Sequence, residues 1–223
     1  MTLEEAIAKI KPLDHNAMEI AQKRWDSIAK PLHSLGKLET LLIQIAGITG
    51  NAEVDLSRRG LIAMCADNGV VEEGVTQTGQ EVTAIVAENF LKYDTSVGVM
   101  CKQNHAEIFP VDMGMVTDTK VRTDHKIAYG TQNMTKGPAM TREQAVKGLE
   151  AGIDMVRELN DKGYRILATG EMGIGNTTTS SAVASVLLKQ PVEEMTGRGA
   201  GLTSEGLVRK INAIKKAIAL NEP

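Results

Sequence analysis

The sequence has few aromatic residues, two cysteines and no excess of basic charge, and each of these shortages excludes a class of protein. Aromatic residues make up 3% of 223 positions, the net charge is −3, and no basic run is interleaved with aromatics. This composition does not predict nucleic-acid binding. No apolar stretch approaches the roughly 20 residues that a membrane span needs. Because the N-terminus TLEEAIAKIKPL is charged rather than signal-like, we expect a cytoplasmic protein without a membrane partner.

Cysteine and histidine are too sparse and too scattered to predict a disulfide framework or a metal site. Cys65 and Cys101 have neither C-x-x-C spacing nor a neighbouring histidine, which indicates reduced thiols. The four histidines lack the spacing of metal ligands; they are His15, His33, His105 and His125. We therefore expect no metal.

The length and the 42% hydrophobic content allow one sizeable core and a small helical annex. The annex is predicted at residues 1–55, where Thr2 and Glu5 form a capping box and Asn16–Lys30 and Lys37–Thr49 have helical apolar spacing. His33 and Ser34 between them could be a catalytic pair, but adjacent side chains rarely face each other, so we interpret this corner as a turn.

Residues 56–223 alternate between strands and helices, which is typical of a Rossmann-like α/β fold with a parallel sheet flanked by helices. Strands are predicted at Leu61–Ala66, Glu107–Val111 and Ile166–Ala168. Helices are predicted at Gln80–Lys92, Ser96–Gln103, Thr141–Leu159, Thr179–Lys189 and Ser204–Leu220. Residues 117–140 have no periodicity, and loops of this length are usually functional or disordered.

The stretch Tyr164–Ala182, YRILATGEMGIGNTTTSSA, predicts a buried strand, a glycine loop and a helix start. Asn176, Thr177 and Thr178 are interpreted as cap-type residues. Such a junction directs backbone N–H groups and a helix dipole at one point, which suits a phosphate. The loop resembles a Walker A motif with Asn176 in place of lysine, which favours a monophosphate over a nucleoside triphosphate. Alternatively, the glycines make only a tight turn.

Each predicted strand ends in an acid, one residue and a glycine, at Asp67-Asn68-Gly69, Asp112-Met113-Gly114 and Glu171-Met172-Gly173. The carboxyl ends of parallel strands share one edge of the sheet, so three carboxylates are expected along one rim. Beside a phosphate, they would face sugar hydroxyls, a developing cation or turn amides. Alternatively, each acid only ties down its own turn.

Lys210 lies at the edge of the apolar stripe of the last predicted helix. It could serve as a ligand for the phosphate, or its ammonium group could simply extend from that stripe into solvent.

Several motifs together resemble the nicotinate-nucleotide:dimethylbenzimidazole phosphoribosyltransferases of cobalamin assembly. The motifs stand in the same order along the chain and are Lys30–Glu39, Ala66-Asp-Asn-Gly-Val70, Glu73-Gly-Val-Thr76, Gln80-Glu-Val-Thr83, Gly130-Thr-x-Asn133, Gly137-Pro-Ala-Met-Thr141, Gly170-Glu-Met-Gly-Ile-Gly-Asn-Thr-Thr178, and Gly197-Arg-Gly-x-Gly201-Leu202 with Arg209-Lys210. The resemblance covers the whole chain.

The resemblance implies transfer of phosphoribose from nicotinate mononucleotide to 5,6-dimethylbenzimidazole or a related base, in a homodimer and without a cofactor. Glu171 would act in catalysis, facing the ribose or the growing cation. The phosphate and ribose would bind Gly173, Ile174, Gly175, Asn176, Thr177, Thr178, Gly199 and Lys210. The acceptor base would bind Asp67, Thr76 and Gln80.

The sequence departs from the family in one important respect. The family places its general-base glutamate in a C-terminal segment that no residue here matches, so we expect a truncated chain that binds nicotinate mononucleotide weakly and turns over poorly. Asn68, Thr76 and His33 stand where His, Ser and Gly are common. Two alternatives remain, namely a non-catalytic nucleotide-binding or regulatory relative, and an unrelated phosphosugar enzyme.

Overall fold

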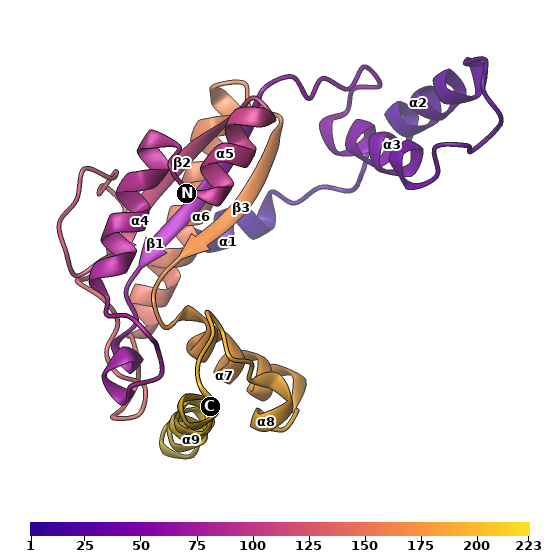
Figure 1. Cartoon of the computed structure of the whole chain (residues 1–223). Coiled ribbons are helices and arrows are strands. Elements are labelled where there is room, and N and C mark those ends of the chain that lie inside the picture. The colour runs from indigo at the N-terminus through magenta and orange to yellow at the C-terminus, as the bar shows by residue number, and fades with distance from the viewer.

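The computed structural model describes residues 1–223 and contains one parallel sheet with the strand order β2-β1-β3 (Figure 1). The strands are β1 (Arg59–Ala66), β2 (Ala106–Gly114) and β3 (Ile166–Met172). Leu61 in the central strand is in register with Ile108 of β2 and Ala168 of β3. Helices flank this sheet, which confirms the predicted α/β class.

The helices agree closely with those expected from the sequence. They are α1 (Leu3–Ala8), α2 (His15–Ser27), α3 (Lys37–Thr49), the short 3₁₀ helix η1 (Gly69–Glu73), α4 (Glu81–Lys92), α5 (Ser96–Gln103), α6 (Arg142–Asp161), α7 (Asn176–Leu188), α8 (Val192–Met195) and α9 (Ser204–Asn221). The predicted capping boxes are present at the starts of α1 and α6. The short elements η1 and α8 were not predicted, because neither is long enough to show a periodic pattern.

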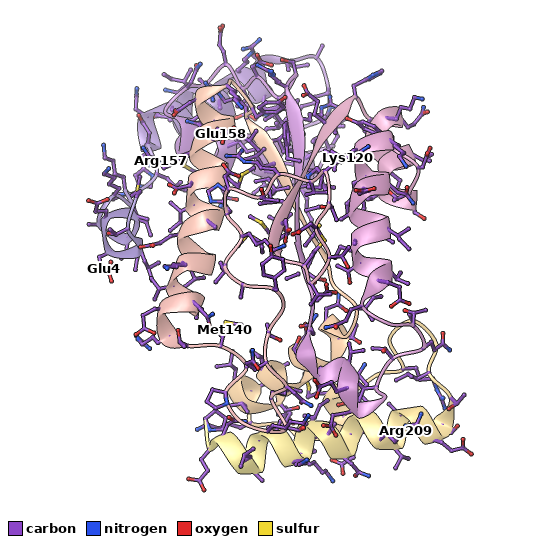
Figure 2. The ribbon with its side chains drawn as sticks, turned by 90° about the vertical axis from the view of Figure 1, so that its left-hand side faces the viewer. Glu4, Lys120, Met140, Arg157, Glu158 and Arg209 are labelled. Carbon is purple, nitrogen blue, oxygen red and sulfur yellow. The ribbon has the colours of Figure 1, made fainter.

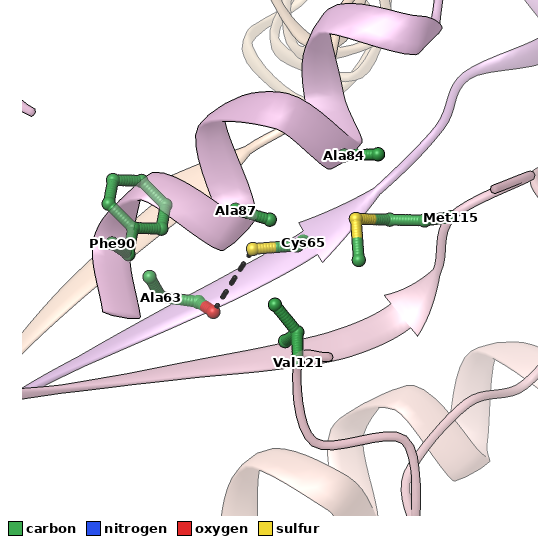
Figure 3. Close-up of a cluster of buried hydrophobic side chains, with 7 residues drawn as sticks. All are labelled: Ala63, Cys65, Ala84, Ala87, Phe90, Met115 and Val121. Atoms are coloured by element: carbon green, nitrogen blue, oxygen red, sulfur yellow. Dashed lines mark hydrogen bonds between the residues drawn. The ribbon is translucent and has the colours of Figure 1, made fainter. Parts of the chain in front are cut away.

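Alternate residues of β1 face opposite sides of the sheet and build two cores, as a pleated strand requires. On one side, Ala63 and Cys65 pack against Ala84, Ala87 and Phe90 of α4 (Figure 3). On the other side, a second buried cluster joins the sheet to α6; its members are Ile62, Val111, Met155, Leu159 and Tyr164. These two cores fix the carboxyl ends of the strands, where the candidate site lies.

Helices α2 and α3 pack against each other and stand apart from the sheet in Figure 1. The corner between them is a turn, as expected, because Ser34 N–H donates to the Pro31 carbonyl at 3.2 Å and Gly36 N–H to the His33 carbonyl at 3.0 Å. Glu39, of which 3% is exposed, accepts from Leu35 N–H and pairs with Lys30 at 2.8 Å. His33 and Ser34 therefore belong to a structural corner.

Helices α7, α8 and α9 lie beyond the strand end toward which the arrowheads point in Figure 1. In Figure 2, α9 crosses below α6, and the labelled Arg209 projects from it. The irregular segment between β2 and α6 is held against the strand ends by backbone hydrogen bonds, including Ile127 N–H to the Met113 carbonyl at 3.0 Å and Thr131 N–H to the Asp67 carbonyl at 3.0 Å. No helix is both long enough and apolar enough to cross a membrane.

Candidate functional site

The glycine loop begins later, and its helix earlier, than the sequence predicts. Strand β3 continues to Met172 because Gly170 and Glu171 pair with Ala63 and Met64 of β1, so Glu171 lies in the strand and not in the loop. Helix α7 begins at Asn176, and Gly175 occupies its N-cap with φ +92°. Asn176, Thr177 and Thr178 are therefore the first turn and not the cap. Glycine holds the cap because this left-handed conformation strains other residues.

The loop leaves an alternating set of backbone N–H groups without an acceptor. Ile174 N–H donates to Thr83 Oγ1 at 3.0 Å, and Asn176 and Thr178 N–H groups donate to loop carbonyls at 3.0 and 2.9 Å. The N–H groups of Gly173, Gly175 and Thr177 donate to no group of the chain. No side chain caps α7, so its N-terminus offers unpaired donors and the positive end of its dipole.

Two glycines allow backbone segments to approach closely at this site. A Cβ on Gly173 would overlap the carbonyl oxygen of Ala66 at the end of β1. A Cβ on Gly199, where φ is +57°, would lie 2.8 Å from Thr177 Oγ1 and 3.4 Å from Lys210 Nζ. The loop after α8 thus packs directly on the first turn of α7, and both positions require glycine.

Lys210 supplies the cation that the loop itself lacks. Only 1% of Lys210 is exposed, so its ammonium group does not extend into solvent. Nζ donates to Thr177 Oγ1 at 2.7 Å and to the Gly197 carbonyl at 3.1 Å. Burial lowers the pKa of Lys210 below its usual value. An ammonium group has three donors, so one remains for a ligand.

These groups surround one cavity of about 290 Å³. Eight of the twelve residues predicted for the site line it, and they are Thr76, Gly173, Ile174, Gly175, Asn176, Thr177, Gly199 and Lys210. Seven further lining residues were not predicted for the site, and they are Val75, Gln77, Thr78, Met172, Arg198, Ala200 and Leu202. Most of these residues lie inside the family motifs named in the sequence analysis, so membership of those motifs could have predicted them as lining residues.

Glu171 does not line this cavity, but it is next to two residues that do, Met172 in sequence and Asn176 through a hydrogen bond. It keeps a solvent-exposed face, and its carboxylate accepts a hydrogen bond from the Asn176 side chain. Desolvation raises the pKa of Glu171, and the Asn176 hydrogen bond opposes this rise. Because β3 ends one residue after Glu171, the carboxylate is held next to the loop by the sheet itself.

The expectation of three carboxylates along one open rim is wrong for the two aspartates. Both are fully buried. Asp112 accepts from the N–H groups of Gly114 and Met115 at 2.9 and 2.7 Å, and Lys126 lies 3.1 Å away. Asp67 accepts from Val116 N–H at 2.8 Å, and desolvation raises its pKa. Asp112 ties down its own turn, which is the alternative that the sequence left open, whereas Asp67 holds the turn after β2 and not its own.

Three of the predicted binding residues do not line the cavity. Asp67 is fully buried and lines a separate hollow at the strand ends, and Thr178 is fully buried inside α7. Gln80 turns toward the end of β1, where its Nε2 donates to the Asn68 carbonyl at 3.2 Å. Thr76 does line the cavity, although its hydroxyl already donates to the Thr78 carbonyl at 2.8 Å.

A second hollow of about 200 Å³ lies between the strand ends, the segment before α6 and α6 itself. Its walls include Met113, Ile127 and Met140 and carry no lysine or arginine. No group of three or more His, Cys, Asp or Glu side chains is arranged to hold a metal ion. The cavity at the glycine loop differs from the second hollow because it contains both backbone N–H groups without an acceptor and a buried lysine. This combination suits one phosphate group.

Comparison with known proteins gives one consistent family. A phosphoribosyltransferase family model matches residues 10–223. The nicotinate-nucleotide–dimethylbenzimidazole phosphoribosyltransferase of Ruminiclostridium cellulolyticum is 51% identical over 225 residues, which are 100% of this chain and 64% of that protein. The protein of the same name from Clostridium tetani is 47% identical over 223 residues, or 99% of this chain and 62% of that one.

Solved structures agree with the sequence relatives. The crystal structure of CobT from Thermus thermophilus superimposes with a TM-score of 0.83 at 36% identity, covering 92% of this chain and 62% of that one. The chain thus spans less than two thirds of the length of the relatives it matches.

Proposed function

Since the chain belongs to the nicotinate-nucleotide–dimethylbenzimidazole phosphoribosyltransferase family, we propose that it acts in transfer of phosphoribose from nicotinate mononucleotide to 5,6-dimethylbenzimidazole or a related base. The products would be α-ribazole 5′-phosphate and nicotinate, as part of cobalamin biosynthesis. The observation that carries this proposal is the cavity where three unpaired loop amides meet buried Lys210.

The donor phosphate would bind at the N-terminus of α7. The N–H groups of Gly173, Gly175 and Thr177 would donate to its oxygens, and the third donor of Lys210 would complete the contact. Gly199 permits this approach because any larger residue would reach Thr177 and Lys210. Ile174, Asn176 and Thr178 would shape the loop around the phosphate. A single phosphate fits the charge of a single lysine better than a triphosphate does.

The reaction exchanges one carbon–nitrogen bond for another. A ring nitrogen of the base would attack the anomeric carbon, and the bond from that carbon to the pyridinium nitrogen would break. The bonding pair would return to the ring, so nicotinate leaves with a neutral pyridine ring, and the N–H proton of the base would pass to water. The carboxylate of Glu171 would stabilise the positive charge that grows on the ribose, which is an electrostatic contribution to the transition state. This chemistry requires no cofactor in our proposal.

The acceptor base would bind beside the loop, near Thr76, Gln80 and Asp67. Thr76 lines the cavity. Gln80 would act by holding the segment that follows β1, and Asp67 by holding Val116 in the segment that follows β2. The alternative of a non-catalytic relative is not favoured, because relatives of this similarity are named as transferases and the chain retains both Glu171 and Lys210.

We also propose that residues 1–55 belong to a small helical domain, distinct from the nucleotide-binding residues 56–223, and that the protein is a homodimer. Exposed apolar side chains on and beside α3 support a further packing surface there, including Leu35, Leu38 and Leu41 at 47%, 50% and 53% exposure. Light scattering coupled to size exclusion would test the dimer. A cytoplasmic location stays a prediction.

Calorimetric titration with nicotinate mononucleotide tests the donor site. We expect binding that inorganic phosphate competes away and that nicotinate alone does not reproduce. Mass spectrometry of a mixture containing dimethylbenzimidazole then tests the reaction by the appearance of α-ribazole phosphate. A chain that binds neither the nucleotide nor phosphate would contradict the proposed function.

A further inference from the structure

Asn68 connects three parts of the candidate site, although the sequence analysis assigns it no role in binding. It follows β1 directly after Asp67 and is half-buried. Its Nδ2 donates to the carbonyl of Ile174 in the glycine loop at 3.1 Å, and its Oδ1 accepts from Thr179 Oγ1 of α7 at 3.4 Å. Its own main-chain carbonyl accepts from Gln80.

The glycine loop rests directly on this side chain. A Cβ on Gly173 would lie 3.0 Å from Asn68 Nδ2, and one on Gly175 would lie 3.2 Å from Asn68 Cβ. Neither glycine could carry a side chain without moving Asn68. The loop and Asn68 therefore form one packed unit, in which Asn68 Nδ2 faces Gly173 and Asn68 Cβ faces Gly175.

The hydrogen bond to Ile174 fixes the direction of a particular N–H group. The Ile174 carbonyl and the Gly175 N–H belong to the same peptide group, which is planar and trans, so the two bonds point in opposite directions. Because Asn68 holds the carbonyl on its own side, Gly175 N–H must point away from Asn68. That N–H is one of the three without an acceptor in the chain.

We propose that Asn68 is a positioning residue for the phosphorylated donor: by anchoring the Ile174 carbonyl it orients Gly175 N–H toward the phosphate. This inference rests on the proposed function. A donor that is oriented before the ligand arrives costs no reorganisation on binding, so the effect should be seen in affinity for phosphate-bearing ligands. Asn68 itself need not touch the ligand.

Three substitutions separate this role from general stabilisation. Asn68→Ala removes the anchor and should weaken binding of inorganic phosphate and nicotinate mononucleotide about tenfold, the loss expected for one well-oriented hydrogen bond. Asn68→His can still donate an N–H to Ile174 and should bind within about threefold of the wild type. Asn68→Asp keeps the shape but cannot donate and adds a negative charge near the phosphate, so it should lose more than Asn68→Ala.

The matched control is Asn104→Ala. Asn104 Nδ2 also donates to a main-chain carbonyl, that of Met100 at 2.9 Å, but at the end of α5. All variants would be titrated by calorimetry in the full chain below their melting temperatures, with nicotinate riboside, which lacks the phosphate, as the second ligand. We expect Asn104→Ala to bind like the wild type and the Asn68 effects to vanish for the riboside.

The outcomes distinguish this inference from the proposed function. Equal phosphate binding by the wild type and Asn68→Ala overturns the role of Asn68 alone, as does an equal loss for the riboside. If Asn68→Ala does not fold, the comparison of the isosteric Asn68→Asp with Asn68→His decides, and equal affinity of these two variants refutes the role. A wild-type chain that binds neither phosphate nor the nucleotide overturns both proposals.

Discussion

Replacing Lys210 with methionine should remove the ammonium group from the cavity while keeping a side chain of similar length. Nζ uses two of its three donors on Thr177 Oγ1 and the Gly197 carbonyl, so one remains for the phosphate. A hydrogen bond to a charged group contributes about 1.5–3 kcal/mol. At about 1.4 kcal/mol per factor of ten, the affinity for nicotinate mononucleotide should fall about ten- to a hundredfold.

The pH dependence of nucleotide affinity is a second, independent test of Lys210. Burial lowers the pKa of Lys210, so the wild type should bind the nucleotide less tightly as the pH rises through that lowered pKa and the amine becomes neutral. In the ligand-free protein, the stability changes with pH in the opposite direction. Between the lowered and the ordinary pKa, the unfolded chain holds the proton more tightly, so the free energy of unfolding rises with pH. Lys210→Met should lose both contributions.

Calorimetric titration over a range of alkaline pH values would measure the first effect, and urea unfolding over the same range the second. Lys216→Met is the matched control, because Lys216 lies on the same helix but is exposed. Nicotinate riboside separates charge from shape. If Lys210→Met weakened the riboside as much as the nucleotide, or if its affinity kept the pH dependence of the wild type, Lys210 would not be the partner of the phosphate.

Three further substitutions and one control test the site and the fold around it. Gly173→Ala places a Cβ against the Ala66 carbonyl and should abolish phosphate binding in calorimetry. In the control Gly152→Ala, in α6, the new Cβ meets nothing within 4 Å, so the free energy of unfolding should rise by up to about 1 kcal/mol. Normal phosphate binding by Gly173→Ala would contradict the packing argument. Desolvation raises the pKa of Glu171, so nucleotide affinity should increase as the pH rises through that pKa and the ionised carboxylate meets the cationic pyridinium ribose. The affinity of Glu171→Gln should lack this increase with pH. If the increase is the same in Glu171→Gln, another group causes it. Thr135 is 1% exposed and lies 2.7 Å from Glu73, so Thr135→Val should lower the free energy of unfolding by about 1–3 kcal/mol, measured in urea. The Thr135 hydrogen bond lowers the pKa of Glu73, so the stability that this bond contributes is lost as the pH falls through that pKa. The free energy of unfolding of Thr135→Val should therefore fall less at acid pH than that of the wild type.

The helices could be predicted because their signals are local. Thr141 and Gln144 cap α6 as the sequence indicated, and α3 and α5 begin and end at the predicted residues. A capping box or an apolar stripe depends on residues within one or two turns, so the sequence contains the whole signal.

Strand β3 and the start of α7 were predicted less well because distant residues decide them. Gly170 and Glu171 are weak strand formers, yet they continue β3 because β1 offers them backbone partners. Asn176 has the chemistry of a cap, but Gly175 takes that position, since only the path of the chain across the end of β1 determines which residue needs a positive φ.

The sequence by itself determined the class of fold, the place of the glycine loop and the family resemblance that the comparisons confirm, because these depend on periodicity and on motifs of neighbouring residues. It could not decide which carboxylates are open or where Lys210 points. The tertiary structure buries Asp67 and Asp112 under turn amides and brings Lys210 to Thr177 from 33 residues away. The physical reason is that most buried polar groups take a partner, and that partner can come from any part of the chain.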